Sequence, residues 1–532
     1  MSDGIVFVGL PGSGKTEVGR RVAERLGRPF IDIDHEIERI SGRTAADLLS
    51  ASGEFEMRSV EREAVECAVA TRGAVIATGG GTVLDPLNRW RLMEHGIRIR
   101  LDVHIEQLAA RLGSDPIARP LVGTDLESGL RRTADERAAM YAAADVALDA
   151  TADPDAVAHA AIATIEGAAM DGWRTLFDGK FQRNHPVGAA DGRVRMGRHI
   201  TAAALHDTLA AVGGRPRFVI DRAARDCHAT LVAIAAADRT LVLEGGEHAK
   251  TFDQLQVVLA WMAEQDVERG DPLVVIGGGT IGDLGGLAAA LHRRGVALVN
   301  VPTTWLAQAD SAIGGKVAVD LPTAKNGVGT FWPASLVVAD ADLPATQPVE
   351  RRRDGIAECI KCALIGDAQL WELAERRGPA ALDGHDPAAA YALTERAVRL
   401  KLAIVERDPF ETGERRKLNL GHTIGHALEI ESGYTLAHGE AVALGLRAVA
   451  HIANGRGAET DLAERIDSIL AALGFSLTRG FDRAAVVAAI GGDKKRERGV
   501  QRWILPMAVG EVVEVNDVTE AEVDAALDVI SR

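Results

Sequence analysis

Cysteines are scarce in this chain of 532 residues. Only four occur, at Cys67, Cys227, Cys359 and Cys362. So few thiols in so long a chain argue against a disulfide framework and indicate a reducing compartment. A signal peptide and an uninterrupted apolar run long enough to cross a bilayer are also missing. We therefore expect a cytoplasmic protein.

A surplus of basic residues is missing as well. The 60 Lys and Arg residues are outnumbered by 76 Asp and Glu residues, which gives a formal net charge of −16. Nucleic acids and anionic membranes bind basic surfaces, so neither is expected as the main partner. Small anionic substrates can still bind where Lys and Arg cluster locally. The length predicts about three or four domains, each with an ample core.

The first motif that is present is Gly9-Leu-Pro-Gly-Ser-Gly-Lys-Thr16, a G-x-x-x-x-G-K-[ST] loop. It follows the apolar residues 5–8 and precedes a periodic stretch that ends at Gly27, which predicts a strand, a loop and a glycine-capped helix. Lys15 would reach the transferred phosphate and Thr16 would hold Mg²⁺. The residues expected at the nucleotide are Gly12, Ser13, Gly14, Lys15 and Thr16.

Further polar motifs follow this loop. In Phe30-Ile-Asp32-Ile-Asp34 the alternation of a strand places both aspartates on one face, where one supports Mg²⁺ and the other faces an acceptor hydroxyl. By itself an Asp-x-Asp pair is more typical of a strand-end turn. The remaining motifs are Gly53-Glu-Phe-Glu-Met-Arg58-Ser-Val-Glu61, Thr78-Gly79-Gly80-Gly81, Ala118-Arg119-Pro-Leu121 and Arg137-Ala-Ala-Met-Tyr141.

With these motifs, residues 1–165 resemble shikimate kinase. The resemblance implies that Arg58 and Arg137 clamp the substrate carboxylate, a role that suits planar guanidinium groups. It also implies that Asp34 binds the ring hydroxyls and orients or deprotonates the attacking one, while Asp32 supports Mg²⁺ through water. The glycines that let the backbone approach the ring are Gly79, Gly80 and Gly81.

The resemblance further implies a lid over residues 113–124. Arg119 would bring positive charge to the γ-phosphate of ATP as this lid closes and excludes water. The alternative is a surface arginine in a flexible loop. The chain departs from the family at Met57, where phenylalanine is usual, and this apolar exchange leaves Arg58 in place.

A second glycine-rich segment, residues 277–286, follows the predicted strand at residues 273–276. It contains a G-x-G-x-x-G pattern, which is weak support for a dinucleotide site. The acidic residue that a Rossmann dehydrogenase carries about twenty positions later is missing, because that region reads Val296-Ala-Leu-Val-Asn-Val301. A standard dehydrogenase is therefore disfavoured.

Polar motifs surround this segment in a fixed order. They are Gly245-Gly-Glu247-His-Ala-Lys250, Val301-Pro-Thr303-Thr304, Asp310-Ser-Ala-Ile-Gly-Gly-Lys316, Lys325-Asn326, Ala357-Glu358-Cys-Ile-Lys361, Arg415-Arg-Lys-Leu-Asn419-Leu-Gly-His422-Thr-Ile-Gly-His426, His438-Gly-Glu440 and Asp493-Lys494-Lys495. Over residues 186–532 this set resembles 3-dehydroquinate synthase.

The histidines allow two interpretations. His422 and His426 are four residues apart on a predicted helix, so on their own they look like a zinc pair. The resemblance instead implies that Glu358, His422 and His438 bind a divalent metal, Zn²⁺ or Co²⁺, and that His426 contacts substrate. The alternative for His438 is a structural role. Cys359 and Cys362 also look like a redox or zinc pair, but lacking a partner pair they are interpreted as small buried residues.

The resemblance implies NAD⁺ as a cofactor that is used without net consumption, so the reaction is that of a lyase or cyclase. The residues implied at NAD⁺ are Gly245, Glu247, Lys250, Gly279, Gly282, Asp283, Thr303, Thr304, Lys316, Lys325 and Thr346. Those implied at the substrate are Asp310, Lys316, Asn326, Lys361, Arg415, Asn419, His426 and a lysine of the pair Lys494 and Lys495. Lys316, Lys361 and His426 would take part in catalysis. Arg294 would contact the substrate phosphate across a homodimer formed by this half.

The fold expected is α/β: a P-loop kinase domain fused to a Rossmann-like NAD-binding domain and a mainly helical metal-binding domain. The expected boundaries are 1–168 for the kinase, 169–190 for a linker, 191–345 for the NAD-binding domain and 346–532 for the helical domain. ATP with Mg²⁺ serves the first half.

Alternatives remain. Related sugar-phosphate cyclases share the NAD⁺ and metal machinery, although Arg415, Asn419 and His426 favour a substrate with a carboxylate. A P-loop kinase with another hydroxy-acid or sugar acceptor is a second possibility. A third is that one half is an inactive binding module, against which the complete motifs of both halves argue.

Overall fold

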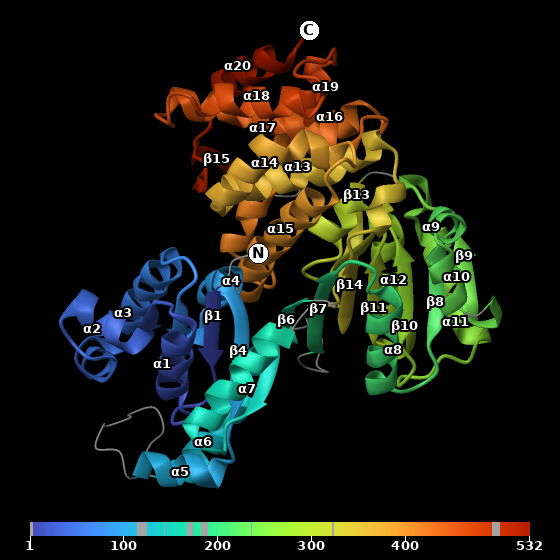
Figure 1. The fold of residues 1–532 in the computed structure, drawn as a ribbon. Coiled ribbons are helices and arrows are strands. Elements are labelled where there is room, and N and C mark those ends of the chain that lie inside the picture. The colour runs from blue at the N-terminus through green and yellow to red at the C-terminus, as the bar shows by residue number, and fades with distance from the viewer. Residues whose placement is uncertain are drawn as a thin grey trace. The chain divides into compact units, whose positions relative to one another are not determined.

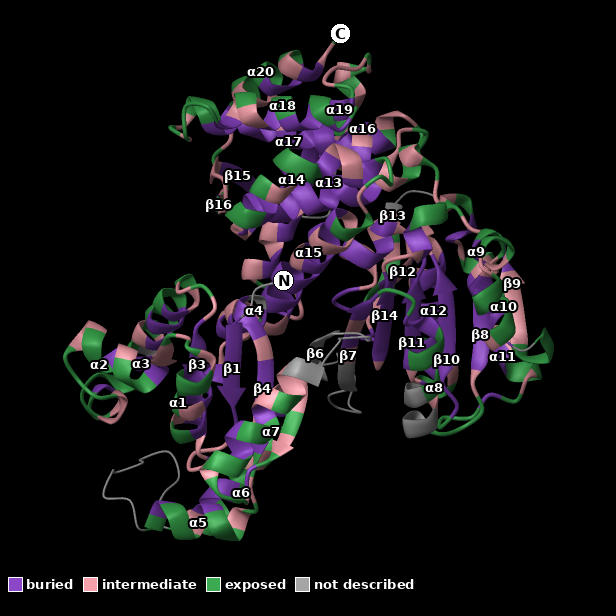
Figure 2. Cartoon of the chain, in the orientation of Figure 1, coloured by how far each residue is buried: buried purple, intermediate pink, exposed green. Residues whose placement is uncertain are grey.

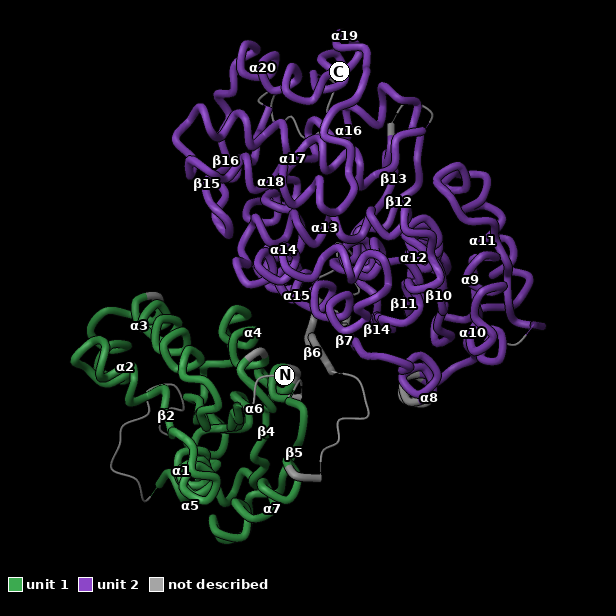
Figure 3. Tube along the Cα trace, turned by 45° about the horizontal axis from the view of Figure 1, so that its top comes forward, with its two compact units in different colours: residues 1–180 green, residues 181–532 purple. Residues whose placement is uncertain are grey.

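The computed structural model describes residues 4–113, 125–142, 144–167, 174–181, 190–235, 237–321, 324–491 and 501–532. The chain forms two compact units, Met1–Lys180 and Phe181–Arg532 (Figure 3). The division falls within strand β6 (Arg174–Phe181), in the segment interpreted from composition as a linker. That segment therefore contains regular structure, and the finer domain boundaries stay a prediction.

The first unit contains a parallel sheet with the strand order β2-β3-β1-β4-β5 among its described residues. Its paired strands β1 and β4 are labelled in Figure 1. The strands are β1 (Gly4–Val8), β2 (Phe30–Asp32), β3 (Val75–Ala77), β4 (Gly96–Asp102) and β5 (Val146–Asp149). The helices are α1 (Lys15–Leu26), α2 (Ile33–Ser41), α3 (Ala45–Ala70), α4 (Pro86–His95), α5 (Ile105–Gly113), α6 (Leu126–Ala142) and α7 (Pro154–Gly167).

Strand β1 shows why this sheet is covered on both faces. Val6 and Val8 pack in one apolar cluster with residues of α2, α3 and α4. Ile5 and Phe7 pack in another with residues of α1 and α7. Because successive side chains of a strand point to opposite faces, a continuous apolar run requires a layer on each side.

A second sheet has the order β6-β7-β14-β11-β10-β8-β9, and its strands from β7 onward belong to the second unit. Its strands beyond β6 are β7 (Ala190–Gly197), β8 (Arg217–Asp221), β9 (Thr240–Leu243), β10 (Leu273–Gly277), β11 (Leu298–Pro302) and β14 (Leu336–Asp340). The helices here are α8 (Thr201–Val212), α9 (Arg222–Cys227), α10 (Ala229–Ile234), α11 (Phe252–Glu264) and α12 (Gly279–Leu291). Strands β12 (Lys316–Leu321) and β13 (Ala324–Phe331) form an antiparallel hairpin.

The rest of this unit is mainly helical. Its elements are α13 (Val349–Gly366), α14 (Ala368–Leu382), α15 (Pro387–Arg407), α16 (His422–Glu431), α17 (His438–Gly455), α18 (Leu462–Ala472), α19 (Arg483–Gly491), α20 (Glu520–Ile530) and the hairpin β15 (Trp503–Ala508) and β16 (Glu511–Val515). Figure 2 shows that α13 and α17 are largely buried. Small and apolar residues on most faces of both helices explain this central position.

The observed architecture confirms the predicted α/β fold with a helical C-terminal part. Helix α1 ends at Gly27, whose φ of 62° is left-handed as predicted for a glycine cap. Cys359 and Cys362 are buried free thiols, again as predicted. Among the described helices, none combines the length and apolar character needed to span a membrane.

Candidate active sites

The phosphate loop of the first unit lies between β1 and α1. Gly12 and Gly14 have φ values of 82° and 91°, which favour glycine and are typical of loops whose N–H groups bind an anion. The Lys15 ammonium, 7% exposed, donates to the carbonyl oxygen of Gly9 at 3.0 Å. Ser13 Oγ is buried and has no hydrogen-bond partner in the described part of the chain. These donors fit the phosphates of a nucleotide.

The two aspartates after this loop lie on different elements, so the prediction from strand alternation is wrong. Asp32 ends β2, whereas Asp34 lies in the first turn of α2. Asp32 caps this helix, because its Oδ1 accepts from the backbone N–H of Asp34 at 3.0 Å. Its Oδ2 accepts from Thr16 Oγ1 at 2.6 Å. Thr16 and Asp32 thus form a pair of oxygen ligands that fits Mg²⁺.

The glycines after β3 face side chains that are predicted to bind the substrate. A Cβ atom on Gly79 would lie 2.7 Å from Asp34 Oδ1. A Cβ atom on Gly81 would lie 2.6 Å from Arg58 Nη1. Larger residues would therefore displace both side chains, which explains why this segment consists of glycine.

Arg137 and Arg58 are each fixed by neighbouring groups. Arg137 Nη1 donates to the carbonyl oxygen of Gly80 at 2.6 Å, and the Tyr141 hydroxyl donates to the same oxygen at 2.7 Å. Glu61 is 3% exposed and accepts from Arg58 Nη1 at 2.8 Å. Sequence reasoning assigned Glu61 no role, although its position one helical turn after Arg58 is a signal for such a contact.

Some predicted residues cannot be placed. Arg119, with residues 114–124 of the predicted lid, lies outside the described residues, and so do Lys494 and Lys495. Their roles stay predictions.

The predicted NAD⁺ residues of the second unit gather at one edge of its sheet. Gly245 and Glu247 follow β9, Gly279 and Gly282 lie at the start of α12 after β10, and Thr303 and Thr304 follow β11. In α/β proteins, nucleotides bind at this carboxyl edge of parallel strands. A Cβ atom on Gly279 would lie 2.9 Å from Ser311 Oγ, so the helix start is closely packed.

A polar cluster around the buried side chain of Lys250 lies near this edge. Lys250 Nζ is 2.5 Å from Asp283 Oδ2 and also donates to Asn326 Oδ1. Burial raises the pKa of Asp283 in spite of the positive charge of Lys250. Asn326 has a φ of 51°, an uncommon value outside glycine that is concentrated at functional sites. Thr346 follows β14, and its hydroxyl lies 3.1 Å from Nε2 of His228.

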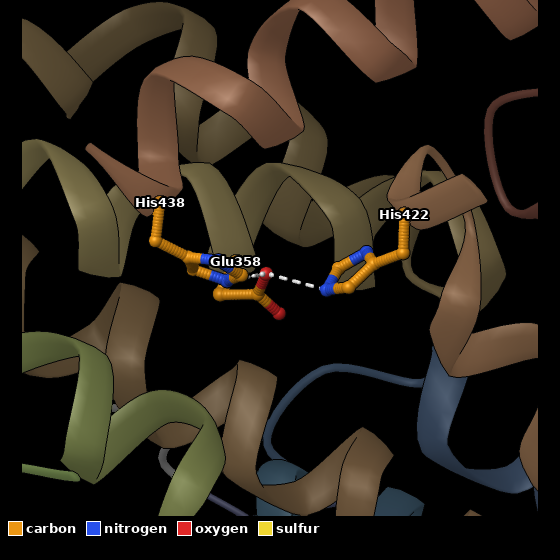
Figure 4. Close-up of side chains that lie close together, drawn as sticks. All are labelled: Glu358, His422 and His438. Atoms are coloured by element: carbon orange, nitrogen blue, oxygen red, sulfur yellow. Dashed lines mark ion pairs between the residues drawn. The ribbon is translucent and has the colours of Figure 1, made fainter. Parts of the chain in front are cut away.

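The candidate metal centre consists of Glu358 on α13, His422 on α16 and His438 on α17. Their ligand atoms lie within 4.8 Å of one another. Figure 4 shows the two imidazole rings on either side of the Glu358 carboxylate. Glu358 Oε1 is 3.5 Å from His422 Nε2 and 3.4 Å from His438 Nε2. Nδ1 of His422 contacts the carbonyl of Leu420 at 3.0 Å, and Nδ1 of His438 contacts Glu429 at 2.9 Å. With Nδ1 so engaged, each ring presents Nε2 to the centre, which fits a divalent cation.

Electrostatics at this centre also favour a cation. Burial alone would lower the pKa of His438, but hydrogen bonds to Glu358 and Glu429 raise it to about 10. Burial alone would raise the pKa of Glu429, but the hydrogen bond from His438 and nearby positive charges lower it to about 2. The carboxylates therefore stabilise positive charge at the ring.

A cavity of about 820 Å³ is lined by residues predicted to bind substrate. The predicted residues in its wall are Asp310, Lys316, Asn326, Arg415, Asn419 and His426. His426 is one helical turn after His422, with ring centroids 5.1 Å apart, but it is not part of the metal-binding group. Lys361 is 1% exposed, pairs with Glu358 and lies 3.9 Å from Asp310 Oδ1.

Two residues of this cavity were missed from the sequence. Lys401 on α15 is buried and donates to Asp310 Oδ1 at 2.6 Å. Burial would raise the pKa of Asp310, but the charges of Lys401 and Lys361 hold it well below its usual range. The signal for Lys401 was a lysine flanked by Leu400 and Leu402 in an otherwise apolar helical stretch.

Glu411 is the second missed residue. Its backbone is left-handed, with a φ of 59°, and its side chain pairs with Lys316 and accepts from Asn419 Nδ2 at 2.8 Å. Burial would raise the pKa of Glu411, but the charge of Lys316 outweighs it and leaves the pKa below its usual value. No sequence pattern marks Glu411, because its place depends on this turn. Arg294 also has a left-handed φ, 66°, and its contact with a partner subunit stays a prediction.

Family models match three parts of the chain. Residues 11–166 match shikimate kinase, residues 240–354 match the N-terminal part of 3-dehydroquinate synthase, and residues 355–496 match its C-terminal part.

Individual proteins agree with these matches. The 3-dehydroquinate synthase of Jannaschia sp. (strain CCS1) is 40% identical over 308 residues, which cover 56% of this chain and 83% of that protein. The 3-dehydroquinate synthase of Xanthomonas campestris pv. campestris (strain 8004) is 42% identical over 294 residues, which cover 53% of this chain and 79% of that protein. A solved 2-epi-5-epi-valiolone synthase from Streptomyces hygroscopicus subsp. jinggangensis 5008, with NAD⁺ and Zn²⁺ bound, has a TM-score of 0.61 at 30% identity and covers 65% of this chain and 99% of its own.

Fold and sites define a P-loop kinase joined to a metal-dependent cyclase with a nucleotide-binding sheet. The matches agree with this class in both parts of the chain. The chain belongs to the 3-dehydroquinate synthase family, and a shikimate kinase domain precedes the synthase part.

Proposed function

We propose that this chain catalyses two steps of one route towards chorismate. The first is ATP-dependent phosphorylation of shikimate to shikimate 3-phosphate. The second is cyclisation of 3-deoxy-arabino-heptulosonate 7-phosphate to 3-dehydroquinate and phosphate. The observation that carries the proposal is that one chain holds a phosphate loop, the arginines Arg58 and Arg137 beside the glycines after β3, and a Glu-His-His centre near a cavity whose wall includes several Lys and Arg side chains.

In the kinase unit, the substrate is held by charge and oriented for attack. Arg58 and Arg137 bind its carboxylate, and Asp34 accepts the proton of the attacking hydroxyl. Lys15 leaves the loop carbonyl to bind the transferred phosphate. Thr16 and Asp32 hold Mg²⁺, which offsets the negative charge of the phosphates when it is bound.

In the synthase unit, Glu358, His422 and His438 hold Zn²⁺ or Co²⁺, and the carboxyl edge of the sheet holds NAD⁺. A metal held by these residues would supply Lewis-acid polarisation of a substrate hydroxyl, and bound NAD⁺ would supply reversible hydride acceptance. Arg415 and Asn419 bind the substrate carboxylate from the cavity wall. His426 faces the same cavity, where its imidazole exchanges a proton with the substrate.

A second candidate for this unit is cyclisation of a sugar phosphate without a carboxylate. The likeness to 2-epi-5-epi-valiolone synthase favours it. Arg415 and Asn419 in the cavity wall argue against it, because a guanidinium and an amide together suit a substrate carboxylate.

We further infer a cytoplasmic homodimer formed through the synthase unit, with neither nucleic acid nor membrane as a partner. The acidic net charge supports the absence of nucleic acid and membrane as partners, and the few thiols support the compartment. The homodimer rests on the resemblance to the synthase family alone. Light scattering of the purified chain tests the oligomeric state.

Reciprocal variants test the assignment of two activities to two sites. Lys15→Met should lower shikimate phosphorylation by at least about 100-fold and leave dehydroquinate formation unchanged. Lys361→Met should instead lower dehydroquinate formation and leave shikimate phosphorylation unchanged. Loss of both activities in either variant, at an unchanged melting temperature, would contradict two separate sites.

A further inference from the structure

Glu429 is a buried carboxylate to which no sequence motif assigns a role. It lies on α16 and is 2% exposed. Its Oε1 is 2.9 Å from Nδ1 of His438, whose Nε2 faces Glu358 at the metal centre. His438 therefore stands between Glu429 and the position of the metal.

A histidine binds a metal through one ring nitrogen only when the other nitrogen carries the proton. A carboxylate that accepts this N–H fixes the tautomer and the ring orientation, and its loss typically weakens metal binding about 10- to 100-fold. At His422 the corresponding acceptor is the backbone carbonyl of Leu420, at 3.0 Å. A side-chain substitution can therefore remove this support at His438 but not at His422.

The other oxygen of Glu429 leads towards the nucleotide edge of the sheet. Its Oε2 lies 3.6 Å from Nζ of Lys325, which lies 3.2 Å from Glu247 Oε1. Glu247 Oε2 in turn accepts from Thr280 Oγ1, at 3.3 Å, at the start of α12. A continuous series of polar contacts thus runs from the glycine-rich segment to the metal ligand His438.

We propose that Glu429 is a positioning residue for His438, and that Lys325 links it to the nucleotide edge so that NAD⁺ and the metal bind cooperatively. The proposal rests on the proposed function of the synthase unit. A nucleotide that contacts Glu247 or Lys325 fixes the lysine, and the lysine then holds Glu429 in the position that His438 requires. The second ligand consequently binds to a site that is already ordered, which is positive coupling.

The first experiment measures metal binding without substrate. Co²⁺ affinity of the full chain is determined by competition with a chelating dye, together with the visible spectrum of bound Co²⁺. We expect Glu429→Ala to weaken Co²⁺ binding by about 10- to 100-fold. Glu429→Gln should have a smaller effect, because its amide oxygen still accepts from Nδ1, and both variants should change the Co²⁺ spectrum.

Glu431→Gln is the matched control. Glu431 lies two residues further on the same helix, but its contacts are the backbone N–H of Asp482 and Arg479. We expect its Co²⁺ affinity and spectrum to be those of the unmodified chain. Kinase activity and the melting temperature verify folding of each variant. Unchanged Co²⁺ affinity and spectrum in folded Glu429→Ala or Glu429→Gln would overturn the positioning role.

The second experiment measures coupling. Co²⁺ affinity is compared without NAD⁺ and at saturating NAD⁺, the saturating concentration being set separately for each variant. NAD⁺ should tighten Co²⁺ binding at least about fivefold in the unmodified chain, and Lys325→Met should abolish this gain. The coupling through Lys325 would be overturned if NAD⁺ left the Co²⁺ affinity of the unmodified chain unchanged, or if it raised the Co²⁺ affinity of Lys325→Met by the full factor. Both experiments omit substrate, so their outcome is separate from failure of the cyclisation reaction.

Discussion

Alanine at position 81 tests the geometry of the kinase site with a single added carbon atom. The Cβ of Gly81→Ala would lie 2.6 Å from Nη1 and 2.7 Å from Nη2 of Arg58. The backbone at Gly81, with φ −100° and ψ −7°, is not in the left-handed region. The substitution therefore acts by displacing the guanidinium and leaves the chain unstrained.

The size of the effect follows from what the displaced group binds. A hydrogen bond to a charged partner contributes about 1.5–3 kcal/mol. Its loss corresponds to a rise of about 10- to 100-fold in the KM for shikimate, since each 1.4 kcal/mol is a factor of ten. The KM for ATP should change much less, because the three atoms nearest to the added Cβ all belong to Arg58 and none belongs to the loop that begins at Gly9.

Steady-state kinetics of both substrates provide the assay, and dehydroquinate formation by the same chain provides the internal control. An unchanged KM for shikimate would refute the placement of Arg58 at the substrate carboxylate. An equal rise in the KM values of shikimate and ATP would indicate a general loss of the site instead.

Three further predictions follow from the structure. Chelation of divalent metals should abolish both activities. Restoring Mg²⁺ alone should restore shikimate phosphorylation but not dehydroquinate formation; equal recovery of both activities with Mg²⁺ would contradict a separate metal centre in the synthase unit. Lys401→Met should lower dehydroquinate formation by at least about tenfold at unchanged kinase activity, because it removes the ammonium that binds Asp310 at 2.6 Å; an unchanged rate would exclude this role. Hydrogen bonds from Arg456 and then Thr519 lower the pKa of Glu522 to about 2. Its stabilising contribution is therefore present above the unfolded pKa of about 4.3 and is lost as pH falls towards 2. For this half-buried surface pair the contribution is below about 1 kcal/mol. Urea unfolding from pH 5 to 3 should show less acid destabilisation for Glu522→Gln than for the unmodified chain; identical pH dependence would contradict the assignment.

Much of the fold could be predicted because local patterns determine it. The buried strands β1, β8, β10 and β11 are short apolar runs bounded by turn residues, and the glycine loop between β1 and α1 has a fixed spacing. The helix of Asp34 was missed because the capping hydrogen bond of Asp32 ends the strand two residues earlier than alternation suggests. Strand β6 was missed because composition alone does not show which neighbour a segment pairs with.

The residues of the candidate sites likewise fall into those that could be predicted from local patterns and those that could not. Residues within spaced motifs, such as Glu358 and His438, could be named from the sequence. Lys401, Glu411 and Glu429 could not, because their importance comes from contacts across the fold. Lys401 meets Asp310 from a different helix, and Glu411 depends on a left-handed turn. In the sequence, Glu429 cannot be distinguished from other helical glutamates, because its role comes from its hydrogen bond with His438.

The most direct test of the account gives the purified full chain each substrate in turn. The synthase reaction contains NAD⁺, Zn²⁺ or Co²⁺, and either 3-deoxy-arabino-heptulosonate 7-phosphate or sedoheptulose 7-phosphate; the kinase reaction contains shikimate, ATP and Mg²⁺. Phosphate release is followed and each product is identified. The account predicts 3-dehydroquinate from the first sugar phosphate only and shikimate 3-phosphate from the kinase reaction. A carbocycle formed only from sedoheptulose 7-phosphate would contradict the account and make the second unit a different cyclase.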